Sequence, residues 1–345
     1  MSHPLRVGFI GAGANTRERH IPGLAAIDGV ELAAVCNRSV ASAQKVCDAF
    51  NIPRATDRAA DLFADDTIDA IVIGTWPDQH APLTIAALEA GKHVMCEARM
   101  ATDAPSAEAM LHASQRRPDL VAQVVPSPFT LTLDAAIRRC LADRLGTLRS
   151  VRIEILPGVV TDRPRPATWR LRRCYSGNNI MSVGIWVEAM MRWVGPVAEL
   201  TAELTTAIPE GVAPATGQPV AIDVPDHVEA VGRLASGAAW SLIASTVVPA
   251  DPSDAGVQRQ RILLTGDAGT LHVEMGQATF HPAHGSPEPL TSDPSAGWRV
   301  EADFVDAIRD GTPITLTDFA TGLQYMRFTD ALHESHRLGV AVRVS

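Results

Sequence analysis

The sequence has no apolar run approaching the roughly 20 consecutive residues that a membrane-spanning helix needs. It also lacks a basic excess, since 30 Lys and Arg stand against 39 Asp and Glu and the net charge is -9. Nucleic-acid binding calls for a basic face, so we expect neither a nucleic-acid partner nor a membrane. Cysteines are few and scattered, five in all with no CxxC pair. This pattern favours reduced core thiols in a cytoplasmic protein over a disulfide framework.

The chain does have the length and the apolar content for more than one core. At 345 residues it exceeds what one hydrophobic core usually fills, and 46% of its residues are hydrophobic. We therefore expect a globular protein of two domains.

A glycine-rich turn follows the first β-type run, residues 6–10. It reads Gly11-Ala-Gly13-Ala-Asn-Thr16, a G-x-G-x-x-G dinucleotide fingerprint with its third glycine replaced by threonine. Gly11 permits the tight turn, and Gly13 lets the backbone approach a pyrophosphate at the start of the following helix. Thr16 costs little, because the third glycine serves helix–strand packing. Taken alone, the motif also fits an ordinary turn between a strand and a helix.

A second strand of suitable spacing, residues 30–36, ends in Asn37-Arg38-Ser39. An NAD-binding site usually has a carboxylate here for the ribose diol, and a carboxylate would repel the 2′-phosphate of NADP. Asn37 is neutral, and Arg38 can pair with a phosphate. The sequence therefore favours NADP over NAD, with a solvated loop cation as the alternative role for Arg38.

Strands and helices continue to alternate over the first third of the chain. Helices are expected at 41–50, 59–63 and 81–90, and strands at 68–73 and 92–96. This alternation predicts a doubly wound parallel sheet, in which ligands lie beyond the carboxyl ends of the strands. The predicted cofactor-binding residues are Gly11, Gly13, Asn15, Thr16, Asn37, Arg38, Ser39, Thr75, Trp76, Pro77, His80 and Glu97.

The rest of the chain predicts a second α/β domain. After a helix at 133–143, apolar and polar residues alternate at 151–155 and 197–204, and hairpins are expected at 228–247 and 262–273. Alternation gives a sheet one buried face and one face that is exposed or part of an interface. Segments 207–219, 249–256 and 281–297 are rich in proline and glycine, so they are expected to be surface loops.

Several phrases spread over nearly the whole chain together resemble one family. They are VGFIGAG followed by HIPGL, TWPDQHAPLTIAALEAGKHV, Cys96-Glu97, Trp169-Arg170, and a C-terminal segment that begins DFVDAIRDGTPITLTDF. With them the chain resembles the glucose–fructose oxidoreductase, inositol dehydrogenase and rhizopine catabolism (Gfo/Idh/MocA) family.

The resemblance implies a Rossmann domain at 1–124 and a C-terminal α/β domain at 125–345 for substrate binding and oligomerisation, with an open, mostly antiparallel sheet. It also implies bound NAD(P), a small-molecule substrate, and homodimers or homotetramers built through the C-terminal sheet.

The chain departs from this family where the family has its proton relay. The usual Glu-Lys-Pro triplet reads Glu97-Ala98-Arg99, so alanine stands at the lysine position. In the usual Gly-Gly-x-x-x-Asp-x-Gly-x-His motif, Ser182 stands for the aspartate and Trp186 for the histidine. A hydride leaves a carbinol carbon only if some group takes the hydroxyl proton, and neither alanine nor tryptophan can. Arg99 stays protonated, so it can clamp a carboxylate or phosphate but cannot accept a proton.

Other residues are candidates for the missing acid–base step and for substrate binding. Tyr175, just before the altered motif, and His80, at a helix start, could move a proton; a packed aromatic and a helix or cofactor contact are the alternatives. Arginines are dense at 163–173 and, with Arg99, suggest an anionic substrate such as a sugar acid; a solvated loop or a subunit contact is the alternative. The predicted substrate-binding residues are Arg99, Arg165, Trp169, Arg170, Asn178, Asn179 and Trp186.

Two histidine pairs invite a metal interpretation that the sequence does not support. His281-x-x-His284 and His333-x-x-His336 have no carboxylate or cysteine at clear ligand spacing, and a site needs three or four ligands. No metal is therefore expected.

Three functions remain open. The first is an NAD(P)-dependent oxidoreductase with a remodelled proton relay, acting on a small polar substrate. The second is a lyase, isomerase or glycosidase that oxidises its substrate only transiently with bound NAD(P). The third is a dinucleotide- or metabolite-binding protein that has lost catalysis.

Overall fold

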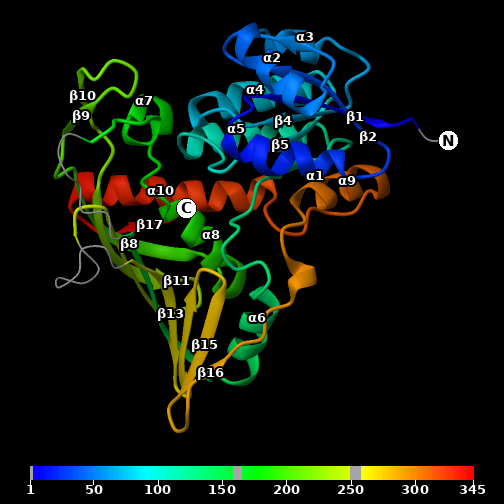
Figure 1. Ribbon diagram of the computed structural model, residues 1–345. Coiled ribbons are helices and arrows are strands. Elements are labelled where there is room, and N and C mark those ends of the chain that lie inside the picture. Colours follow the sequence, from blue (N-terminus) through cyan, green and yellow to red (C-terminus); the bar gives the residue numbers. More distant parts are fainter. Residues whose placement is uncertain (1–2, 158–164, 249–257) are drawn as a thin grey trace. The chain divides into compact units, whose positions relative to one another are not determined.

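The computed structural model describes residues 3–157, 165–248 and 258–345. The chain forms two compact units, one of residues 1–126 with 299–323 and one of residues 127–298 with 324–345 (Figure 1). The domain boundary expected after residue 124 lies close to the end of the first segment. Residues 299–323, expected in the second domain, belong instead to the first unit. They are tied to its sheet by backbone hydrogen bonds, such as Val124 N to Thr317 O at 3.0 Å.

The first unit is a parallel six-stranded sheet in the order β3-β2-β1-β4-β5-β6, with helices in the connections. Its strands are β1 (Leu5–Ile10), β2 (Val30–Cys36), β3 (Ala55–Thr56), β4 (Ala70–Ile73), β5 (His93–Cys96) and β6 (Ala122–Val124). Its helices are η1 (Thr16–His20), α1 (Ile21–Ala25), α2 (Val40–Phe50), α3 (Ala59–Phe63), α4 (Pro77–Glu89), α5 (Ala104–Gln115) and α9 (Val300–Asp310). The expected doubly wound sheet is confirmed.

Local chemistry explains the element ends. Every residue of β4 is buried, as a strand covered on both faces requires. Ser39 caps α2 by accepting a hydrogen bond from Ser42 N, and Asn51 ends it in the left-handed conformation. Helix α4 begins at Pro77 rather than at residue 81, because proline suits the first turn of a helix.

The second unit is a nine-stranded sheet in the order β16-β15-β14-β13-β7-β12-β11-β8-β17. Only the β7–β12 pair is parallel among its described pairs, so the expected mostly antiparallel sheet is confirmed. Its strands are β7 (Leu148–Leu156), β8 (Val197–Thr205), β11 (His227–Leu234), β12 (Ala239–Ser245), β13 (Arg259–Gly266), β14 (Gly269–Glu274), β15 (Gln277–Pro282), β16 (Glu288–Pro289) and β17 (Val342–Arg343). Its helical segments are α6 (Asp134–Asp143), η2 (Trp169–Leu171), α7 (Arg173–Ser176), α8 (Val183–Val194) and η3 (Pro294–Ala296). Helix α10 (Phe319–Leu338) contains the boundary between the units.

Two expectations for this unit were incomplete. The segments 207–219 and 281–297 are not only loop, because β9 (Glu210–Val212) in the first pairs with β10 (Pro219–Ala221) and the second contains β16 and η3. Cys174 is exposed, whereas the other four cysteines are buried as expected. The predicted loop at 249–256 lies outside the described residues.

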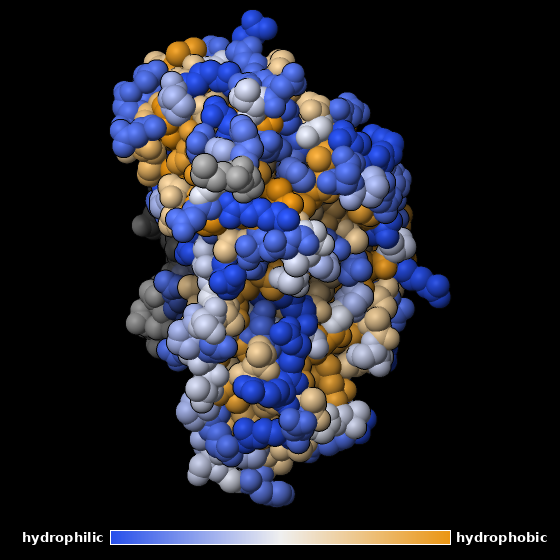
Figure 2. Space-filling model, turned by 90° about the vertical axis from the view of Figure 1, so that its right-hand side faces the viewer, coloured by the Kyte–Doolittle hydropathy of each residue, from blue (hydrophilic) through white to orange (hydrophobic). Residues whose placement is uncertain are grey.

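One apolar cluster fills the space between the sheet and the helices of the second unit. It includes Trp186, Trp240 and Phe328, and the last two rings meet edge to face at 5.3 Å. Figure 2 shows hydrophilic and hydrophobic residues intermixed over the visible face. No helix among the described residues is long and apolar enough to cross a membrane.

Candidate functional site

The loops that carry the predicted cofactor residues begin at one edge of the first unit's sheet. The hydrogen-bond ladder continues past the strand ends. Gly11 N donates to Cys36 O at 2.8 Å, Gly74 N to Ile10 O at 2.8 Å, and Glu97 N to Ile73 O at 2.9 Å. The loops after β1, β2, β4 and β5 are thus brought together, as the doubly wound sheet predicts.

The glycine-rich turn after β1 packs directly on the loop after β4. Gly11 has φ +82°, and a Cβ on it would lie 2.7 Å from Thr75 N. Gly13 is exposed, and its Cβ would meet only Gly74 O, at 3.4 Å. The tight turn and the bare backbone at Gly13 fit a pyrophosphate. Thr16 is 1% exposed and packs against the β4 side, so its side chain serves packing.

The three residues after β2 have different roles. Asn37 Oδ1 accepts from Ala12 N at 2.9 Å, and its Nδ2 donates to Ser42 O at 3.1 Å. Ser39 caps α2, so Asn37 and Ser39 shape the loop. The guanidinium of Arg38 lies over the Trp76 ring, 5.3 Å from its centre. Arg38 is exposed, which leaves this stacked cation facing solvent beside the glycine turn.

His80 connects two of these loops. It is 1% exposed, with Nδ1 2.9 Å from Arg99 O and Nε2 3.1 Å from Thr75 O. Burial lowers the pKa of His80, whereas hydrogen bonding to the two carbonyl oxygens acts the other way. Because both ring nitrogens face backbone carbonyls, the imidazole holds the loops after β4 and β5 together. This arrangement favours the structural alternative over proton transfer to a substrate.

Glu97 is held by partners that the sequence did not single out. Its Oε1 accepts from Asn15 Nδ2 and from His20 Nε2, the latter at 2.9 Å, while His20 Nδ1 donates to Glu301 Oε1 at 2.6 Å. Burial raises the pKa of Glu97, but the hydrogen bonds and charge of His20 outweigh it and leave the pKa below its usual value. The carboxylate is therefore ionised at neutral pH.

The sequence gives little indication that His20 belongs to the site. Residues 16–20 form a π-turn, in which Ile21 N donates to Thr16 O, so residues five apart share one side. That spacing sets Asn15 and His20 beside the same Glu97 oxygen. Only the phrase HIPGL in the family pattern marked the histidine, and nothing in the sequence marked Glu301, which lies 281 positions further along.

In the second unit, Trp186 occupies the family's histidine position as a core residue. It is fully buried and packs against Phe129, with ring centroids 4.7 Å apart. Asn179 is also buried, and its Nδ2 donates to Ser176 O at 2.7 Å. Asn178 bonds to side chains instead: it accepts from Arg173 at 2.6 Å and donates to Asp330 at 2.7 Å.

The arginine-rich segment does not act as one cluster. Arg165 is 7% exposed and pairs with Asp226 at 2.9 Å, so it is a buried structural cation. Arg170 lies over the Trp169 ring at 4.3 Å, and Arg172 lies 5.2 Å from the Tyr175 ring. Arg163 lies outside the described residues. Arg99, in the first unit, is buried, with 5% of the residue exposed.

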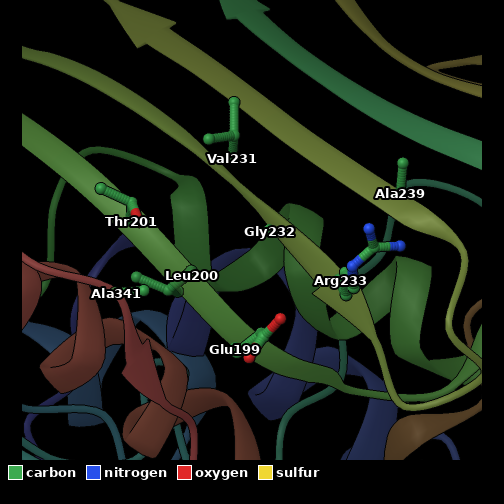
Figure 3. Close-up of a pocket in the computed structure, with 8 residues that line it drawn as sticks. All are labelled: Glu199, Leu200, Thr201, Val231, Gly232, Arg233, Ala239 and Ala341. Atoms are coloured by element: carbon green, nitrogen blue, oxygen red, sulfur yellow. The ribbon is translucent and has the colours of Figure 1, made fainter.

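A hollow of about 260 Å³ lies on the second unit's sheet (Figure 3). It is lined by residues of β8, β11 and β12 and by Ala341. Its polar groups are a glutamate, a threonine and an arginine, which do not form an acid–base pair. The hollow marks a surface of the sheet and carries no chemistry of its own.

Fold and site together define the class of protein. A doubly wound parallel sheet whose glycine-rich turn, Arg38–Trp76 pair and ionised Glu97 meet at one edge is a dinucleotide-binding unit. It is joined in one chain to a unit built on a large mixed sheet.

The family follows from comparison with known proteins. Residues 5–124 match the model of the oxidoreductase family with an NAD-binding Rossmann fold (GFO_IDH_MocA), and residues 134–272 match the GFO/IDH/MocA C-terminal domain. The chain belongs to this family of NAD(P)-dependent oxidoreductases, which confirms the resemblance seen in the sequence.

Among its relatives is 4-carboxy-2-hydroxymuconate-6-semialdehyde dehydrogenase of Sphingobium sp., 34% identical over 32% of this chain and 35% of the relative. The chain thus aligns with about a third of that relative's length. Levoglucosan dehydrogenase of Pseudarthrobacter phenanthrenivorans is 26% identical over 83% of this chain and 82% of its own length.

Solved structures show the same fold over the full length. An oxidoreductase domain protein from Kribbella flavida superposes with a TM-score of 0.88 at 23% identity, covering 100% of both chains. Levoglucosan dehydrogenase in complex with NADH and L-sorbose superposes with a TM-score of 0.85 at 23% identity, covering 99% of both chains.

Proposed function

We propose that this chain catalyses NAD(P)-dependent oxidation or reduction of a small hydroxylated substrate. The observation that carries the proposal is the convergence of the glycine-rich turn and the ionised Glu97 at the ends of β1 and β5. A nicotinamide cofactor bound there would accept or donate the hydride. Gly11 and Gly13 would admit its pyrophosphate, and Glu97 would accept hydrogen bonds from its ribose hydroxyls.

The finer preference for NADP rests on Arg38. Its guanidinium, stacked on Trp76, offers a cation to a 2′-phosphate, and no carboxylate stands at Asn37 to repel it. The test is calorimetric titration of the purified chain and of Arg38→Ala with NADP and NAD. We expect the variant to lose about tenfold or more in NADP affinity and little in NAD affinity. Arg58→Ala, which removes an exposed cation of the same unit, is the control. Equal losses for both cofactors would refute the preference.

The proton acceptor must lie outside the family's usual positions. Trp186 is core, Ala98 has no proton-accepting group, and both nitrogens of His80 face carbonyls. We therefore propose Tyr175, half-buried beside the Arg172 cation, as the acid–base residue. Tyr175→Phe should lower turnover about 100-fold or more while leaving cofactor affinity unchanged. Unchanged turnover would exclude it.

The proposed substrate class rests on the compounds named for the relatives and on the arginines of this chain that could bind an anion. Levoglucosan, L-sorbose, sugar acids and dihydrodiols form a first panel of substrates. Their turnover is measured by the near-ultraviolet absorbance of the reduced nicotinamide. The anionic class depends on Arg99 and Arg170, because Arg165 is already paired with Asp226. If Arg99→Ala binds every carboxylate ligand as the parent does, the anionic class is wrong.

Loss of catalysis is the second candidate, and the burial of Trp186 favours it. The same absorbance experiment separates the functions. Net formation or loss of reduced cofactor supports the oxidoreductase. Product without net change supports a lyase, isomerase or glycosidase that uses the cofactor transiently, and cofactor binding without any product supports a binding protein.

We further propose a cytoplasmic homodimer or homotetramer formed through the open face of the second unit's sheet. Val231 on that face is 60% exposed and borders the hollow of Figure 3, where a second copy would cover it. Light scattering on Val231→Asp should show a smaller particle than the parent. Val40→Asp, which changes an exposed apolar residue of α2, is the control and should leave the mass unchanged.

A further inference from the structure

The first unit contains a row of three ionisable side chains that runs from its interior to the end of β5. His20 lies in the middle, with Nε2 2.9 Å from Glu97 Oε1 and Nδ1 2.6 Å from Glu301 Oε1. The side chains of His20 and Glu301 are 0% and 4% exposed, and that of Glu97 is 15% exposed. Glu97 is thus the most exposed end of the row.

The packing of α1 against α9 makes room for this row. A Cβ on Gly23 would lie 2.9 Å from Glu301 Cγ, so the glycine lets the glutamate reach His20. Asn15 supplies a second donor to Glu97 Oε1. Asn15, His20 and Glu301, from two segments of the chain, therefore hold one carboxylate in place.

The charges of the row do not cancel. Each ring nitrogen of His20 donates to a carboxylate, so the ring is an imidazolium, and two carboxylates leave one net negative charge. Burial alone would lower the pKa of His20, but the hydrogen bonds to Glu301 and Glu97 outweigh it and raise the pKa to about 9. The count therefore holds at neutral pH.

The position of this charge matters for a nicotinamide. In a doubly wound sheet the loop after β2 meets the adenosine ribose, which places the nicotinamide half towards β4 and β5. Glu97 follows β5. The oxidised ring carries a positive charge that the reduced ring lacks, and a buried charge acts on it more strongly than a solvated one.

We propose that the Glu301–His20–Glu97 row, through its net negative charge, biases this site towards the oxidised form of the cofactor. Glu301 and His20 are positioning residues, because they act through Glu97. The inference rests on the proposed use of a nicotinamide cofactor and goes beyond it, since cofactor binding alone does not require a bias.

The decisive variant is Glu301→Gln, which removes one negative charge and keeps an oxygen for His20 Nδ1, and it is measured at a pH at which nitrogen NMR shows its His20 ring still protonated. The dissociation constants of oxidised and reduced NADP are measured by calorimetry on the full chain. We expect the ratio of the oxidised to the reduced constant to rise about three- to tenfold, the Coulomb effect of one charge at this range. A merely structural role would weaken both forms alike and leave the ratio unchanged, which would overturn the proposal.

Glu18→Gln is the matched control, since it removes the same formal charge from an exposed residue of the neighbouring turn. Its ratio should equal that of the parent, and a shift as large as that of Glu301→Gln would also overturn the proposal. If the parent binds neither form, the proposed function itself fails, which is a separate outcome.

A measurement on the parent protects the test against a misfolded variant. Nitrogen NMR of labelled histidine, assigned by the signal missing in His20→Gln, should show both His20 nitrogens protonated at neutral pH. A neutral His20 ring would refute the proposed charge distribution of the row, an imidazolium between two carboxylates.

Discussion

The side chain of Thr16 takes up the space that a side chain at residue 74 would need. A Cβ built on Gly74 would lie 2.1 Å from Thr16 Oγ1 and 2.4 Å from Gly11 O. The third glycine of the usual fingerprint serves helix–strand packing. In this chain the small residue at that contact is on the β4 side, which explains how the turn tolerates threonine.

Gly74→Ala should therefore be strongly destabilising. The methyl group would strike a backbone carbonyl that cannot rotate away, at a cost of about 3 kcal/mol in the free energy of unfolding. Gly13→Ala is the matched comparison, because its Cβ would be 3.4 Å from its nearest neighbour. In thermal melts without cofactor it should match the parent, while losing most of the rise in Tm that NADP gives. Equal melting of the two variants would contradict this account of the turn.

Because the pKa of His20 is raised in the folded state, we expect the protein to lose stability at alkaline pH. Its pKa in the folded state, about 9, lies above its value of about 6.5 in the unfolded chain. Its contribution is fully present below about pH 6.5 and is lost as the pH rises through about 9, for a total of about 3 kcal/mol. Urea unfolding of the parent should show this decline, and His20→Gln should show a flatter profile. His112→Gln, at an exposed position of α5, should decline like the parent.

Because Arg165 forms a buried ion pair with Asp226, we expect Arg165 to stabilise the folded state. Asp226 also accepts from Ala207 N and Ile208 N, at 2.7 and 2.9 Å, so it anchors a loop. Arg165→Met leaves this carboxylate without its cation and should cost about 3 kcal/mol. Arg149→Met breaks an exposed pair with Asp267 and should change the free energy of unfolding far less than Arg165→Met does. Chemical denaturation measures both, and a stable Arg165→Met with weakened ligand binding would restore the substrate role.

The sequence predicted most of the fold because its signals are local. Strand β2 and helix α3 were expected at their observed bounds, since apolar runs and periodicity mark them within a few residues. The return of 299–323 to the first unit was missed because it depends on contacts between residues far apart in sequence, such as Val124 with Thr317. The periodicity of apolar residues along the sequence contains no information about such a pairing.

The site was predicted as a set of loops but not as a set of contacts. The positions of the strand ends predict that Asn15, Glu97 and His80 lie at one edge of the first unit's sheet, and all three are found at that edge. Which side chain bonds to which depends on rotamers and on a π-turn, and a glutamate from α9 enters the same group. Arg165 illustrates the converse: its type suggested anion binding, while its burial with Asp226 was invisible in the sequence.

Restoring the family's histidine should not restore the family's relay. Trp186 is fully buried in the apolar cluster and packs on Phe129 at 4.7 Å, so Trp186→His would leave a cavity and bury a polar ring. We expect a loss of about 2–4 kcal/mol in the free energy of unfolding and no gain in turnover. Trp186→Phe keeps an aromatic in place and loses no hydrogen bond, because the indole Nε1 has no partner among the described residues. It should cost about 1–2 kcal/mol. Denaturation curves and turnover with the sugar panel check both variants, and a stable, faster Trp186→His would show that the position still faces the reaction.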